Sequence, residues 1–137
     1  MIGVQTYRRQ SAPAWTRIDA ILFLYRRADE NLERADSLLA AGDAMAAGKL
    51  LIETQTIVTA FASGLEVADG NSVQLLKLYE YIGHHLAQAT GASIREARKI
   101  LKTLSEGFEA AQDRARVMER TGELPPFSAS SAIVATA

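Results

Sequence analysis

The stretch Leu75–Ala89, LLKLYEYIGHHLAQA, decides the fold, because its apolar residues recur in alternating steps of four and three. This spacing is typical of a helix with one continuous apolar face. That face consists of Leu75, Tyr79, Ile82, Leu86 and Ala89. Tyr81 cannot share it with Tyr79, because two residues of helix turn through roughly 200°. The stretch therefore predicts a second apolar stripe, which comprises Leu78, Tyr81 and His85 and needs a second surface to bury against.

Length and composition narrow the class of protein. At 137 residues the chain has the size of one domain, and its net charge of −1 gives no reason to expect nucleic acid or an anionic membrane as a partner. The absence of cysteine excludes disulfides and thiolate metal sites. The N-terminus lacks the apolar core of a secretion signal, and the run AILFLY is far shorter than a membrane span. We therefore expect a soluble, cytoplasmic domain with no membrane insertion.

The apolar periodicity predicts an all-α fold with helices at about 16–41, 43–67, 72–90 and 93–121. Their short connections require antiparallel neighbours, so we expect an up-down-up-down four-helix bundle. The domain spans 1–121, with a short N-terminal arm before the bundle and a flexible tail over 122–137. The expected helix boundaries are Ser11 and Pro13 or Thr16 and Asp19 for the first helix, Gly42 and Asp43 for the first turn, Asn71 and Gln74 for the third helix, and Gly91 with a Ser93–Glu96 capping box for the fourth.

The second helix carries more apolar surface than one face can hold. Its predicted core stripe is Ala47, Leu50, Thr54, Ile57, Phe61 and Gly64, with Leu51, Val58 and Leu65 beside it. No charged residue lies between Glu53 and Glu66, whereas a solvated helix of that length normally carries charge on its outer face. This helix is therefore either central or covered by something else. The extra stripe is either an open groove or simply buried core.

The sequence resembles the FliS family of flagellin-specific export chaperones from Tyr7 to about Ala115. The features that carry the resemblance are the N-terminal tyrosine with a Ser-x-Pro helix start, Leu24-Tyr25, Ile57-Val58 with Leu65, and above all Leu78-Tyr79-Glu80-Tyr81 followed by Leu86 and Ala89. The last is similar to the family's Leu-Tyr-x-Tyr motif. Each piece alone is weak, but their order and separation on helices of matching length are distinctive.

This resemblance implies a chaperone without enzymatic activity and without a cofactor. Family members bind the disordered C-terminal segment of flagellin in the cytoplasm, prevent premature polymerisation and assist export, with the flagellar export gate as a further candidate partner. The apolar stripes fit grooves for such a client. The expected client-binding residues are Leu51, Val58 and Leu65 on the second helix and Leu78, Tyr81 and His85 on the third. By resemblance, the arm around Val4 and Tyr7 covers a groove until client arrives.

Several alternatives remain open at this stage. Tyr81 is equally consistent with a lone surface aromatic, and Tyr7 with a staple on its own bundle. His84 and His85 face about 100° apart, so they do not share a metal, and no metal site is expected. Residues 17–27 are faintly similar to the first helix of helical chorismate mutases, but the seams of the other helices contain no inward cation for a dianionic substrate. A self-associating bundle is the other candidate, and the expected state is a monomer or weak homodimer.

Overall fold

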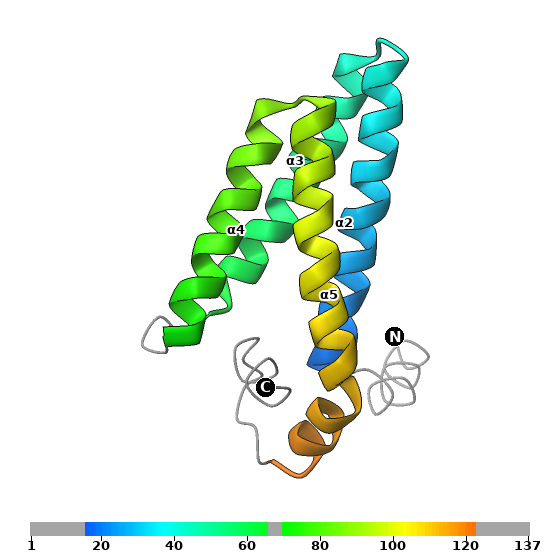
Figure 1. Cartoon of the computed structure of the whole chain (residues 1–137). Coiled ribbons are helices and arrows are strands. Elements are labelled where there is room, and N and C mark those ends of the chain that lie inside the picture. The colour runs from blue at the N-terminus through cyan, green and yellow to red at the C-terminus, as the bar shows by residue number, and fades with distance from the viewer. Residues whose placement is uncertain (1–15, 66–69, 123–137) are drawn as a thin grey trace, which may run out of the picture.

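The computed structural model describes residues 16–65 and 70–122, and within them all regular structure is helical (Figure 1). The four helices are α2 (Arg17–Ala40), α3 (Ala44–Ser63), α4 (Gly70–Gln88) and α5 (Gly91–Arg120). This architecture confirms the predicted all-α four-helix bundle. The N-terminal arm with Val4 and Tyr7, the proposed start at Ser11 and Pro13, and the tail from residue 123 onward lie outside the described residues.

The helices form a ring in which α2 packs against α3 and α5, and α4 packs against the same two. Connections of two or three residues join α2 to α3 and α4 to α5, so each of these pairs runs antiparallel. Figure 1 shows the pair α3 and α4 leaning away from α2 and α5 toward the end of the bundle where α4 begins. The ring places the α2–α5 seam and the α3–α4 seam on opposite sides of the molecule.

The first turn follows the predicted boundary signals. Gly42 has a φ of 85°, a left-handed conformation that glycine adopts without strain, and Asp43 accepts a hydrogen bond from the Ala46 amide at 3.1 Å as the cap of α3. At the start of α2, the second of the two predicted boundaries is present: the Asp19 carboxylate accepts from the Thr16 amide at 3.0 Å. Both ends of α2 were therefore readable from local sequence.

The boundary between α4 and α5 differs from the prediction. The left-handed residue is Ala89, with a φ of 53°, and Gly91 is already the first residue of α5. The capping box is formed by Thr90 and Ser93, whose side chains bond each other's backbone amides at 3.1 and 3.0 Å, so the predicted Ser93–Glu96 box is wrong. The helix begins one turn earlier because Ser93 caps as well from the third position as from the first. At the other connection, α3 ends at Ser63, before the predicted residue 67.

The core of α3 is rotated relative to the predicted stripe. Its buried residues are Ala47, Leu51, Thr54, Ile57, Val58 and Phe61, and Leu65 just beyond its end is buried as well, whereas Leu50 is only half-buried and Gly64 is exposed. Leu51, Val58 and Leu65 are thus core residues, so of the two alternatives that the sequence left open the buried core is the one present. Their role in client binding stays a prediction. Both stripes have unbroken three–four spacing, so only the packing of α3 against α2 and α4 decides which of them faces the core.

An aromatic cluster fills the centre of the ring. The ring of Tyr25 on α2 stacks on Phe61 of α3 at 4.4 Å between centroids and lies 5.5 Å from Phe108 of α5. Its hydroxyl is 2.7 Å from the hydroxyl of Tyr79 on α4, so the two phenols hydrogen-bond across the diagonal of the bundle. Burial raises the pKa of Tyr79 to about 12 and raises that of Tyr25 further. Both phenols therefore stay neutral, and Tyr79 points inward as predicted.

We expect Tyr79→Phe to lower the free energy of unfolding by about 1–2 kcal/mol, because the buried Tyr25 hydroxyl then loses its partner. The double variant Tyr25→Phe/Tyr79→Phe should cost less than the sum of the two single changes, since it leaves neither hydroxyl unpaired. Urea unfolding of the four proteins measures this coupling. Strictly additive losses would mean that the two hydroxyls do not stabilise each other.

A half-buried carboxylate joins the beginning of α2 to the last turns of α5. Asp19 accepts from Gln112 at 2.9 Å and from the guanidinium of Arg116, besides the amide of Thr16. Burial by itself raises the pKa of Asp19, but the hydrogen bonds from Arg116, Thr16 and Gln112 outweigh it and hold the pKa well below its usual range. The carboxylate is thus an acid-sensitive clamp between two helices.

Asp19→Asn should lower the free energy of unfolding near neutral pH by about 2 kcal/mol, because the capping and cross-helix acceptor is weakened. Since the folded-state pKa is depressed, the contribution of Asp19 is complete above the unfolded pKa of about 4 and is lost as the pH falls below it. Denaturant unfolding from about pH 7 to about pH 2 should show the gap between wild type and variant closing. A gap that persists at the acid end would contradict this role.

Candidate functional site

From Ile52 to Ser63 the exposed residues of α3 are uncharged, and the exposed Lys49 lies one turn before them. Among the described residues α3 packs mainly against α2 and α4. Its exposed residues from Ile52 on are Ile52, Thr56, Thr59, Ala60 and Ser63, which we call the α3 outer face. The side chain of Ile52 is 66% exposed. The run without charge between Glu53 and Glu66 therefore does not mean that α3 is central. It marks a surface that lacks the charged residues of an ordinary solvated helix.

The polar atoms of the α3 outer face are partly occupied by the helix itself. The Thr56 hydroxyl donates to the Ile52 carbonyl at 3.1 Å, and the Ser63 hydroxyl donates to the Thr59 carbonyl at 2.8 Å. A hydroxyl bonded to the carbonyl four residues earlier presents its methyl or methylene group outward and has no donor left for solvent. The face is consequently more apolar than its composition indicates.

A groove runs along each side of this face. Between α2 and α3, a cavity of about 280 Å³ is lined by Arg17, Ala20, Ile21, Leu24, Ala60, Phe61, Gly64 and Tyr79. Between α3 and α4, a cavity of about 460 Å³ is lined by Gln55, Val58, Thr59, Ala62, Ser63, Leu76, Tyr79, Glu80 and Gly83. Tyr79 belongs to both linings. The α3 outer face is thus a ridge between two largely apolar grooves that share one aromatic floor.

The second stripe of α4 is arranged as the sequence predicted. Leu78 is 39% exposed and Tyr81 is 48% exposed, while His85 is half-buried and meets Tyr81 edge-on at 4.3 Å between ring centroids. Since Leu76 and Gly83 face the α3–α4 groove, the stripe lies on the other side of α4, toward α5. Both ring nitrogens of His85 are buried without a hydrogen-bond partner among the described residues.

The predicted site residues divide into three groups. Leu78 and Tyr81 are exposed and available, and His85 lies next to them; Leu51, Val58 and Leu65 are buried, although Val58 also lines the α3–α4 groove. The arm residues Val4 and Tyr7 lie outside the described part of the chain. Sequence reasoning missed the exposed ridge with Ile52, Thr59 and Ala60. The sequence signal for this ridge is the absence of charged residues between Glu53 and Glu66, because charged residues are normally found on the outer face of a helix and not in its core.

Other kinds of site find little support in the described residues. Within 16–65 and 70–122 there is no group of three or more histidine, cysteine, aspartate or glutamate side chains that could hold a metal ion. The rings of His84 and His85 lie 6.4 Å apart between centroids. In the same part of the chain, no helix has the length and hydropathy needed to cross a membrane.

Val58→Asp is expected to lower the free energy of unfolding by more than about 3 kcal/mol, because Val58 is 4% exposed and the new carboxylate would be buried without a partner. Thr59→Asp provides the matched control, since the next side chain along α3 is exposed. That change should cost less than about 1 kcal/mol. Thermal or urea unfolding measures the stability of both variants. Equal losses of unfolding free energy in Val58→Asp and Thr59→Asp would contradict the observed rotation of α3.

Comparison with known proteins gives one match. The sequence model of the FliS family, described as flagellar protein FliS, matches residues 2–115. No curated protein and no solved structure matches the chain significantly. The matched region contains α2, α3, α4 and most of α5, and therefore the whole ridge and both of its grooves.

Proposed function

The chain belongs to the FliS family of flagellar export chaperones, and from this premise we propose that it binds the disordered C-terminal segment of flagellin in the bacterial cytoplasm. Binding prevents premature polymerisation and keeps flagellin ready for flagellar type III export. The observation that carries the proposal is the α3 outer face with a groove on each side, because it is an uncharged, exposed ridge on a bundle whose own core is already complete.

The mechanism follows from the shape of this surface. An amphipathic client segment that becomes helical can lay its apolar residues into a groove at helical spacing. The α2–α3 and α3–α4 grooves accept two such segments, one on each side of the ridge, and the exposed stripe with Leu78 and Tyr81 offers a third contact on α4. Ordering the client offsets much of the gain from buried area, so the complex is stable enough for delivery and still releases its client.

The N-terminal arm is proposed to cover a groove in the unloaded protein, as the family resemblance implies. It joins the bundle at Thr16, the residue before α2, and the first turns of α2 supply Arg17, Ala20 and Ile21 to the α2–α3 groove. An arm that holds Val4 and Tyr7 is therefore attached beside that groove. Client binding then displaces a local competitor, so the apparent affinity for client is the intrinsic affinity multiplied by the fraction of uncovered grooves.

Self-association is a second candidate for the same surface. Two copies that pack their α3 outer faces together would bury Ile52 and the neighbouring uncharged residues, as a symmetric dimer does. Such a dimer and a client complex compete for one face. Sedimentation over a range of concentrations, with and without a flagellin peptide, tells them apart. The chaperone proposal is supported if the protein is a monomer that binds the peptide, or a weak homodimer that dissociates when the peptide binds. The alternative is supported by a stable dimer whose sedimentation the peptide does not change.

Ala60→Glu tests the chaperone proposal directly. The residue is exposed on α3 and lines the α2–α3 groove, so the change places a charge on the ridge while the bundle stays folded. We expect affinity for a flagellin C-terminal peptide, measured by calorimetry, to fall at least about tenfold, since the carboxylate must lose water on binding.

The matched control is Ala110→Glu, which makes the same change at an exposed position of α5. It should leave peptide affinity within about twofold of wild type, because surface changes away from the interface contribute little. Equal losses in the two variants, or full binding by Ala60→Glu, would mean that the client does not use the α3 ridge.

A further inference from the structure

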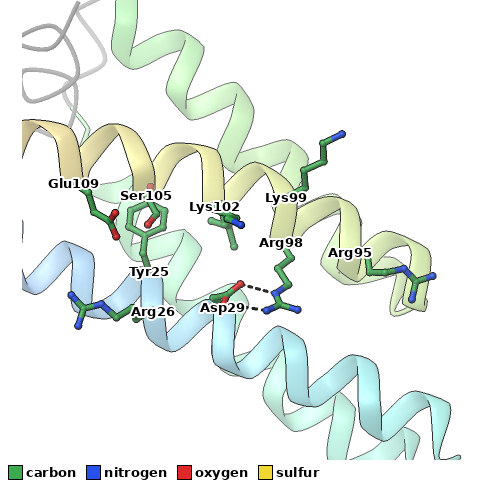
Figure 2. Close-up of a pocket in the computed structure, with 10 residues that line it drawn as sticks. Tyr25, Arg26, Asp29, Arg95, Arg98, Lys99, Lys102, Ser105 and Glu109 are labelled. Atoms are coloured by element: carbon green, nitrogen blue, oxygen red, sulfur yellow. Dashed lines mark hydrogen bonds and ion pairs between the residues drawn. The ribbon is translucent and has the colours of Figure 1, made fainter.

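A further groove lies between α2 and α5, with a volume of about 630 Å³ (Figure 2). Tyr25 and Leu101 contribute its apolar lining. Its charged lining consists of five cations and two anions, namely Arg26, Arg95, Arg98, Lys99, Lys102, Asp29 and Glu109. Glu33 and Asp36 of α2 pair with Arg98 and Arg95 beside this lining, which leaves an excess of one positive charge and three cations without an ion pair among the described residues. We call the groove between α2 and α5 the basic groove.

Ion pairs to α2 fix two of these cations. Arg98 donates to Asp29 through two nitrogens, at 2.6 and 3.3 Å, and reaches Glu33 at 3.4 Å. Arg95 pairs with Asp36 at 3.2 Å. Figure 2 shows Arg98 crossing from α5 to Asp29, so this pair bridges the two walls of the groove. The walls are therefore held in place before any ligand arrives, which lowers the ordering cost of binding.

The other three cations remain available. Arg26 on α2 and Lys99 and Lys102 on α5 are exposed, and within the described residues none of them forms an ion pair. Lys99 and Lys102 lie one helical turn apart on one wall, and Arg26 lies on the opposite wall. An occupant with carboxylates on two sides can therefore meet cations from both helices.

The geometry points to a docking site for an acidic segment of a second protein, with its carboxylates on Arg26, Lys99 and Lys102 and its apolar side chains over Tyr25 and Leu101. A nucleic acid fits less well, because its closely spaced phosphates would also meet Asp29 and Glu109 in the lining. A membrane is flat and would not enter a groove between two helices. Discrete carboxylates interleaved with apolar residues match both the charges and the lining.

This site does not depend on the proposed flagellin-binding function. The order of helices around the ring puts the basic groove opposite the α3–α4 groove, so an acidic partner and an α3-bound client do not compete for that seam. A chaperone with two such surfaces can hold its client on one side while a partner holds the chaperone from the other.

The test uses the full chain and a synthetic peptide that repeats glutamate and leucine at helical spacing, with a glutamine analogue as the uncharged probe. Fluorescence polarisation should show the glutamate peptide binding at least about tenfold more tightly than the analogue, with the difference shrinking in high salt. Arg26→Gln/Lys102→Gln removes one cation from each wall and should weaken binding about tenfold.

Lys49→Gln/Lys77→Gln is the matched control, because it removes the same charge from exposed positions of α3 and α4. It should change affinity by less than about twofold. Ala60→Glu should also bind the acidic peptide as wild type does, which separates this proposal from the flagellin proposal. Circular dichroism verifies that every variant is folded.

Three results would overturn the inference. One is no measurable binding of the glutamate peptide, and another is an equal loss in the two double variants, which would indicate unspecific attraction. The third is tighter binding of a single-stranded oligonucleotide or of phosphatidylglycerol vesicles than of the peptide, with the same dependence on Arg26 and Lys102. The inference is supported if Arg26→Gln/Lys102→Gln loses affinity for the glutamate peptide and Lys49→Gln/Lys77→Gln does not.

Discussion

The hydrogen bond between the hydroxyls of Tyr25 and Tyr79, 2.7 Å across the diagonal of the ring, joins two residues that line the grooves of the bundle. Tyr79 lines both the α2–α3 and the α3–α4 groove, while Tyr25 lines the basic groove. A phenol in this position satisfies its buried hydroxyl only when α2 and α4 keep their separation. The pair thus sets how far the helices stand apart where the bundle opens toward one end.

A division of charge follows from this ring. The cations of α5 turn toward α2, where Arg95, Arg98 and Arg116 meet aspartates, and α3 on the far side carries no charge over its second half. Most of these ion pairs are partly exposed, so each contributes little to stability. Their effect is chiefly geometric, because they link the two walls of the basic groove, whereas the second half of α3 carries no charge. Two surfaces of opposite character suit two different kinds of partner.

Much of this was predictable from the sequence, and the failures have physical causes. The helices of the bundle and the two faces of α4 follow from periodicity, since Tyr79 and Tyr81 cannot point the same way. On α3, apolar residues occupy so much of the circumference that periodicity alone does not select the buried side. The sequence therefore left the stripe with Val58 open as groove or core, and its burial identifies it as core. Thr90 and Ser93 are both good N-cap residues, so only the packed structure determines at which of them α5 begins. The basic groove requires α2 beside α5, a contact that no local pattern contains.

The most direct test of the central claim is a methyl NMR titration of the isoleucine-labelled protein with a flagellin C-terminal peptide. Ile21 lies in the α2–α3 groove and Ile52 on the α3 outer face, whereas Ile94 is buried on α5. A client on the ridge shifts the methyl signals of Ile21 and Ile52 at peptide concentrations that leave Ile94 nearly unchanged. The account would be contradicted if the peptide binds without changing the methyl chemical shifts of Ile21 and Ile52 but changes those of isoleucines on α5.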